Sequence, residues 1–412
     1  MSTNVLARRL GLTDAVVIGL GAMIGAGVFA ALAPAAAAAG SGLLVSLGLA
    51  AVVAYCNASS SARLAARYPA SGGTYVYGRE RLGPFWGYLA GWTFVVGKTA
   101  SCAAMALTVG LYAWPEHAHV VAVAAVAALT AVDYFGVRKS ALLTRIIVAV
   151  VLLVLAAVVV ACLTSSPLRL SAGADPTATG LLQGAGLLFF AFAGYARIAT
   201  LGEEVRDPAR TIPRAVPLAL GITLVVYTAV AVAVLSALGP GLADSTAPLA
   251  DAVAPELGPV VRAGAAVAAL GSLLALILGV SRTTLAMARD RHLPRGLAAV
   301  HPRFQVPHRA ELAVGAVVAV VAAFADLRAA IGFSSFGVLL YYAVANASAW
   351  TLPGRRLARI VPAVGLVGCL ALAFALPGPS IAAGAGVVAL GIIVYAVRAQ
   401  LARRAGSPGA PS

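Results

Sequence analysis

The sequence predicts an all-α integral membrane protein with about twelve transmembrane helices. Hydrophobic residues make up 61% of the 412 positions, whereas charged residues make up 10%. The mean hydropathy is +0.96. Apolar runs of about 18 or more residues, each long enough to cross a bilayer, recur along the whole chain. This composition excludes a soluble globular domain.

The expected spans follow one another with short connections up to the eleventh. Their ranges are 13–38, 42–64, 85–113, 119–135, 143–164, 181–203, 213–238, 260–286, 310–325, 329–350, 360–376 and 380–398. We expect residues 1–404 to form a single transmembrane domain. The remaining tail, 405–412, is rich in Gly, Pro and Ser and is expected to be disordered.

The basic residues predict the orientation of the chain. An even number of spans places 24 of the 29 Lys and Arg residues in loops on the side of the two termini. By the positive-inside rule, both termini are cytoplasmic in a multi-pass cytoplasmic membrane protein. The net charge of +15 therefore reflects topology, and no nucleic-acid partner is expected.

The first span contains an unusual density of glycine. The segment Gly19–Pro34 reads GLGAMIGAGVFAALAP. Glycine weakens a helix, and a break inside lipid is tolerated only where the freed backbone groups face a cavity or a ligand. The N–H groups of the second half-helix would then suit a carboxylate. The alternative is a small-residue contact between unbroken helices, because Gly21 and Gly25 fit a GxxxG pattern.

The third span carries a lysine near mid-membrane. Before it, Tyr68–Pro84 predicts a connector that could also act as a gate. Lys98 lies about 13 residues into the span, which is too deep to reach water easily. Because burial penalises an ammonium group, Lys98 is a candidate for gaining and losing a proton during a cycle. The alternative is a fixed internal cation that backbone carbonyls satisfy.

The sixth span has a second interruption, at Phe192–Tyr195. Arg197, Glu203 and Glu204 follow it. Gly194 could instead serve close packing, and Arg197 could pair with Glu204. The two interruptions occupy equivalent positions in two five-span halves of opposite orientation. This arrangement is typical of an inverted-repeat transporter with its site at mid-membrane.

Other polar residues carry weaker signals. Ser272 in the eighth span could offer a hydroxyl to a cation, although a bond to its own helix is the alternative. The cysteines show no metal-ligand spacing. The sequence contains no HExxH motif and no paired carboxylates within a span. We therefore expect no catalytic residue, no metal, no cofactor and no enzyme activity.

Three motifs resemble the amino acid–polyamine–organocation transporters over nearly the whole chain. They are GLGAMIGAGVF in the first span, FFAFAGYARIATLGEEVRDPARTIPRA at Phe189–Ala215 and SRTTLAMARDRHLP at Ser281–Pro294. The resemblance implies a five-plus-five inverted-repeat (LeuT-like) fold with helices 1 and 6 discontinuous and two further helices. It also implies substrate contacts through backbone N–H groups at Ile24, Gly25, Ala26 and Gly27, and through carbonyls near Phe190, Ala191 and Ala193. Phe192 or a neighbour would be an aromatic gate, and Gly194 would lie at the break.

The chain departs from its relatives at two points. Proton-coupled members often carry a lysine in the fifth span, where Ile147–Val154 is wholly apolar, so Lys98 would take that role. Ala196 replaces an acidic residue that members often have there. We expect a small or medium neutral amino acid as substrate, moved with protons or by exchange. The alternatives are a cationic amino acid or polyamine carrier, and a membrane sensor or structural subunit without transport.

Overall fold

The protein is almost entirely helical. The structure, a computed structural model, describes residues 10–68, 72–135, 141–168, 170, 175–199, 205–353 and 356–405. Within these ranges no β-strand occurs, and Leu10 and Val205 form one isolated bridge. The α-helices are α1 (Leu12–Met23), α2 (Ala26–Ala30), α3 (Leu32–Ala39), α4 (Leu43–Arg67), α5 (Thr74–Leu82), α6 (Pro84–Ala113), α7 (Ala118–Tyr134), α8 (Ala141–Ser165), α9 (Ala178–Phe192), α10 (Ala196–Ala199), α11 (Pro208–Leu238), α12 (Pro248–Asp251), α13 (Gly258–Arg289), α14 (His308–Phe324), α15 (Leu327–Trp350), α16 (Ile360–Ala375) and α17 (Gly378–Ala405).

Most of these helices could cross a membrane. Eleven helical stretches in the described part of the chain are long and apolar enough to do so. The predicted span 310–325 corresponds to α14, which has 17 residues and is absent from that set. The prediction of a polytopic helical membrane protein is confirmed, and the count of twelve crossings stays a prediction.

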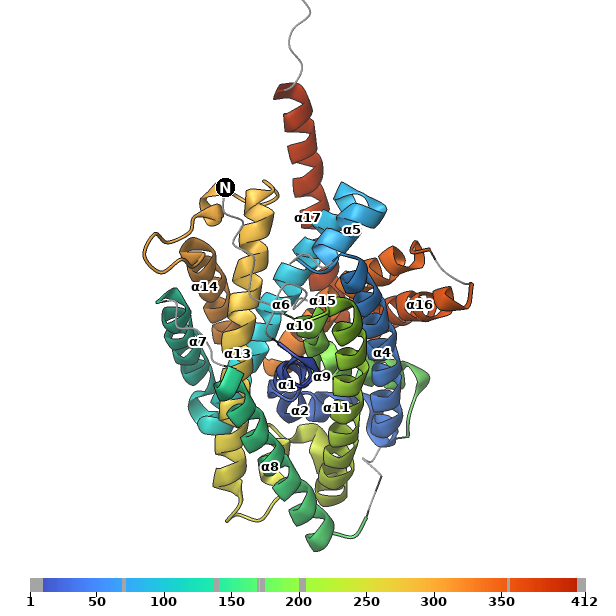
Figure 1. Cartoon of the computed structure of the whole chain (residues 1–412). Coiled ribbons are helices and arrows are strands. Elements are labelled where there is room, and N and C mark those ends of the chain that lie inside the picture. The colour runs from blue at the N-terminus through green and yellow to red at the C-terminus, as the bar shows by residue number, and fades with distance from the viewer. Residues whose placement is uncertain are drawn as a thin grey trace, which may run out of the picture.

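The segment between the second and third spans differs from the sequence prediction. Instead of a plain connector, it contains α5, which lies near one end of the bundle (Figure 1). Gly73 precedes this helix with φ 56° and Gly83 follows it with φ 108°, backbone conformations that favour glycine. Pro84 then begins α6, at a position where its missing N–H costs nothing. Glycine and proline here mark helix ends within a segment that is otherwise helical.

The last helix is longer than predicted. The sequence predicts a span over 380–398, whereas α17 runs from Gly378 to Ala405 and projects beyond the bundle in Figure 1. Ala405, assigned to a disordered tail, therefore ends a helix. The rest of that predicted tail, 406–412, lies outside the described residues.

The helix α6 lies inside the bundle and packs against α13 and α15. The crossing with α15 is close because glycines face each other: a Cβ atom on Gly337 would lie 3.0 Å from the Cα atom of Gly97. Small residues allow such backbone approach, which is how helices associate in lipid. The four cysteines are buried free thiols within the helices. This packing fixes α6 beside the interrupted helices described next.

Candidate functional site

The first predicted interruption is present in the structure. The helix α1 ends at Met23, and α2 starts at Ala26. Between them Ile24 has φ −80° and ψ 55°, and Gly25 has φ −113° and ψ −134°, which are not helical values. The amides that open α2 have no partner within their own helix. The first transmembrane helix is therefore discontinuous, as the glycine pattern predicts.

The glycines at this break also serve close packing. A Cβ atom on Gly25 would overlap the hydroxyl of Ser272, and one on Gly27 would lie 2.6 Å from the Cα atom of Ala191. The Ser272 hydroxyl also lies 3.5 Å from the carbonyl oxygen of Gly21. Close packing of small residues therefore accompanies the break, whereas the alternative of a contact between unbroken helices is wrong for this segment.

The second interruption takes a milder form. The helix α9 ends at Phe192 and passes into a 3-10 turn, Ala193–Tyr195, before α10. The chain keeps helical handedness here and changes only its hydrogen-bond pattern. A Cβ atom on Gly194 would overlap the carbonyl oxygen of Ala22 near the end of α1. The two interruptions therefore lie directly against each other.

A tyrosine from α11 joins the two interruptions. The hydroxyl of Tyr227 lies 2.6 Å from the carbonyl oxygen of Met23 and 3.1 Å from that of Ala191. Its side chain is 2% exposed, and its ring packs against Phe192 at 5.1 Å between centroids. Sequence reasoning missed Tyr227, because an isolated tyrosine in an apolar span carries no motif.

A cavity of about 330 Å³ opens beside this region. Some of the predicted site residues line it, namely Lys98, Phe190, Ala193, Gly194 and Ser272. The others are buried and do not line it in this conformation, namely Ile24, Gly25, Ala26, Gly27, Ala191 and Phe192. Of Phe190 and Phe192, it is thus Phe190 that lines the cavity.

The charged residues that line the cavity, within the described part of the chain, are basic. They are Lys98, Arg197 and Arg282, and the hydroxyl-bearing residues Tyr75, Ser101, Thr283 and Tyr341 line it with them. Among the described residues, no Asp or Glu lines it. Glu203 and Glu204, which the sequence places after Arg197, lie outside the described residues.

Lys98 makes one hydrogen bond that links α6 to the second interruption. Its ammonium nitrogen donates to the carbonyl oxygen of Ala193 at 3.3 Å, and its side chain is 6% exposed. One turn away, the hydroxyls of Ser101 and Ser334 lie 2.5 Å apart. Lys98 therefore lines the cavity and is bonded to a backbone carbonyl, and both its titration and its role as a fixed cation stay predictions.

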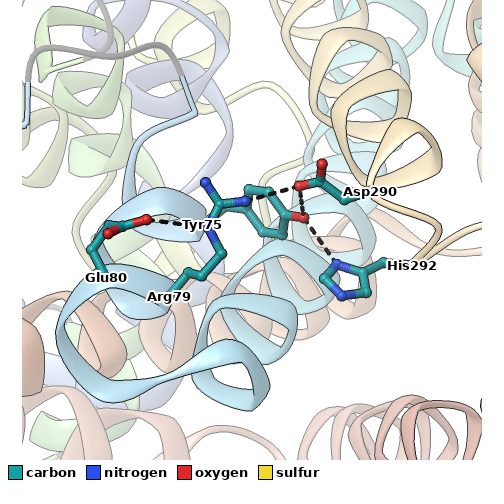
Figure 2. A network of polar contacts seen from close by, with 5 residues as sticks. All are labelled: Tyr75, Arg79, Glu80, Asp290 and His292. Carbon is teal, nitrogen blue, oxygen red and sulfur yellow. Dashed lines mark hydrogen bonds and ion pairs between the residues drawn. The ribbon is translucent and has the colours of Figure 1, made fainter. Parts of the chain in front are cut away.

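A polar network joins α5 to the turn after α13 (Figure 2). The Tyr75 hydroxyl donates to Asp290 at 2.5 Å and lies 2.9 Å from Nδ1 of His292. Arg79 pairs with Asp290 at 3.0 Å and with Glu80 at 3.4 Å. Burial raises the pKa of Tyr75, so its phenol stays a donor. Because Tyr75 lines the cavity, this network, which we call the Tyr75 network, borders the cavity.

We expect the Tyr75 network to weaken on acidification. Burial lowers the pKa of His292 below its ordinary value of 6.5, while Asp290 raises it and Arg398 and Arg79 lower it. The pKa of His292 is lower in the folded state than in the unfolded state, where it is about 6.5, so the unfolded state binds the proton more readily. The folded state is therefore destabilised relative to the unfolded state as the pH falls below about 6.5. The unfolding midpoint of wild type should thus drop more than that of His292→Gln between about pH 7.5 and about pH 5.5. Equal drops in the two proteins would contradict this.

The interrupted helices, meeting beside a cavity within an apolar helical bundle, define the chain as a membrane transporter. Residues 10–398 match the family model for amino acid permeases. The chain therefore belongs to the amino acid permease family, within the amino acid–polyamine–organocation superfamily.

Several relatives carry transporter names. An uncharacterized transporter of Mycobacterium tuberculosis is 73% identical over 97% of this chain and 93% of its own length. Cationic amino acid transporter 4 of Homo sapiens is 30% identical over 82% of this chain and 58% of its own length. A branched-chain amino acid permease of Bacillus subtilis is 24% identical over 95% of this chain and 92% of its own length.

Proposed function

We propose that the protein moves small or medium neutral amino acids across the cytoplasmic membrane by alternating access, with both termini cytoplasmic. The transport is coupled to protons or proceeds by exchange. The observation that carries this proposal is the cavity beside the two interruptions. Its volume of about 330 Å³ suits a small ligand. Its wall carries Lys98, Arg197 and Arg282 and, within the described residues, no carboxylate.

The substrate backbone would be held by the two interruptions. Amides at the start of α2 suit a carboxylate, and carbonyls at the end of α9 suit an ammonium group. Because Ile24–Gly27 do not line the cavity in this conformation, the carboxylate contact requires a movement of α1–α2. Ser272, which packs on Gly25, would have to yield in that movement. This makes Ser272 a positioning residue in the proposal.

A cationic amino acid is the second candidate substrate. The human relative and those from Arabidopsis thaliana are named cationic amino acid transporters, whereas the Bacillus subtilis relative is named a branched-chain permease. A cationic side chain would meet Lys98, Arg197 and Arg282 in the cavity. Like charges weaken binding in such surroundings, which favours the neutral substrate.

The test is uptake of labelled amino acids by proteoliposomes. We expect vesicles with the protein to take up alanine or leucine faster than empty vesicles do. Excess unlabelled arginine should leave this uptake nearly unchanged. Arginine uptake that alanine does not inhibit would favour the cationic alternative.

A sensor or structural subunit that does not transport is the remaining alternative. It would bind an amino acid, detected by thermal stabilisation of the purified protein, and yet give no flux. Binding without flux in vesicles of the same preparation would therefore refute the proposed transport.

A further inference from the structure

The carbonyl oxygen of Ala193 accepts a hydrogen bond from Lys98 and lies in the region proposed above for the substrate ammonium. Lys98 donates to it at 3.3 Å, and both residues line the cavity. The carbonyl belongs to the 3-10 turn that follows α9, the region proposed above for the substrate ammonium. If the substrate binds as proposed, its ammonium group and that of Lys98 compete for this one oxygen.

The surroundings offer Lys98 little other compensation. No Asp or Glu of the described chain lines the cavity. Asp133 and Glu311 lie on the neighbouring helices α7 and α14. The titratable and charged groups that line the cavity with Lys98 are Tyr75 of α5, Arg197 of α10, Arg282 of α13 and Tyr341 of α15, and Cys102 lies one turn along α6.

Two ammonium groups at one carbonyl repel each other, and they do so more strongly where the side chain is as buried as that of Lys98 than they would in bulk water. We propose that the proton on Lys98 and the bound amino acid exclude each other, so that the protein exchanges substrate for a proton. This inference rests on the proposed function, because it needs a zwitterion with its ammonium at this carbonyl. When the substrate enters, the N–H bond of the lysine ammonium breaks and the proton passes to water in the cavity. Lys98 remains as a neutral amine, and no other bond changes.

The exchange fixes the direction of coupled movement. The carrier crosses in one direction with substrate and in the other with a proton on Lys98. Protons flow from the acidic to the alkaline side, so substrate accumulates on the acidic side. Co-transport with a proton would concentrate it on the alkaline side instead. The side on which substrate accumulates therefore distinguishes exchange from co-transport, and a single uptake measurement can determine it.

The first experiment uses the wild-type protein in vesicles preloaded with acidic buffer and placed in alkaline buffer containing labelled alanine. We expect alanine to accumulate in the acidic lumen above its external concentration. Accumulation only with the reversed gradient, or in neither case, would overturn the exchange inference. Alanine equilibration without accumulation would still support transport. The absence of any alanine flux would refute the proposed function itself.

Two substitutions then test whether Lys98 carries the proton. Lys98→Met removes the titrating group, so we expect equilibrative alanine exchange without accumulation. Lys98→Arg keeps a permanent charge of similar reach and should weaken alanine binding at every pH. Accumulation unchanged in Lys98→Met would assign the proton to another residue and overturn the inference.

Binding to the purified protein provides a readout that needs no vesicles. Strict competition weakens alanine binding by about tenfold for each unit of pH below the titration of Lys98. We expect this slope in wild type and its absence in Lys98→Met, measured by thermal stabilisation with alanine. Binding that strengthens on acidification would contradict the inference. If Lys98→Met fails to fold, the wild-type slope and the wild-type gradient experiment decide.

Discussion

Replacement of Gly194 by alanine should abolish transport and destabilise the protein. The added methyl group would overlap the carbonyl oxygen of Ala22, which is a backbone atom and cannot rotate away. Overpacking commonly lowers the free energy of unfolding by about 1–3 kcal/mol. We expect a loss at or above the upper end of this range, because the clash is with a backbone atom. The two interruptions would be forced apart, and the cavity that Gly194 lines would change shape. The measurements are the unfolding midpoint and the alanine exchange rate in vesicles.

A matched control is Gly221→Ala in α11. A Cβ atom there would meet no other atom within 4 Å, and the position is exposed. Alanine favours a helix over glycine by about 0.5–1 kcal/mol, so this variant should be as stable as wild type or slightly more so. If Gly194→Ala matched Gly221→Ala in unfolding midpoint and in alanine exchange rate, the close approach of the two interruptions would not be needed for transport.

Substitution of Tyr227 by phenylalanine should cause the second large loss. It removes the hydroxyl that lies between the carbonyl oxygens of Met23 and Ala191 and keeps the ring that packs on Phe192. Leaving a buried acceptor without a donor costs about 1–3 kcal/mol. We expect a lower unfolding midpoint and alanine exchange slower by about tenfold or more, since about 1.4 kcal/mol corresponds to a factor of ten.

The control for this change is Tyr55→Phe in α4. The side chain of Tyr55 is 49% exposed, so loss of its hydroxyl should leave stability and exchange within error of wild type. Wild-type exchange in Tyr227→Phe would show that the carbonyl groups find other donors. The hydrogen bonds of Tyr227 would then have no role in the cycle.

The sequence predicts the architecture well because lipid imposes strong rules on it. Apolar length marks the crossings, and the density of glycine marks the break between Met23 and Ala26. The same rules give a wrong prediction at α5, because the glycine and proline residues that flank this helix lead to the prediction of a connector. They also misplace the end of α17, because helix propensity continues past the last apolar residues.

The detailed contacts of the site depend on residues far apart in the chain. The bond between Lys98 and Ala193 arises only when α6 packs against the turn after α9, and the contact of Ser272 with Gly25 only when α13 packs against the break between α1 and α2. No local pattern encodes them. Likewise, sequence alone predicts an aromatic gate near Phe192, while only packing shows that Phe190 lines the cavity.

The burial of all four native thiols has a practical consequence for studying the cycle. Cys56, Cys102, Cys162 and Cys369 are each at most 5% exposed. A water-soluble maleimide should therefore react far faster with a cysteine introduced at the surface than with any of them. Pairs of such labels, for example on α5 and at the end of α13, would let fluorescence or spin-label spectroscopy follow the opening and closing of the cavity in an otherwise unaltered chain.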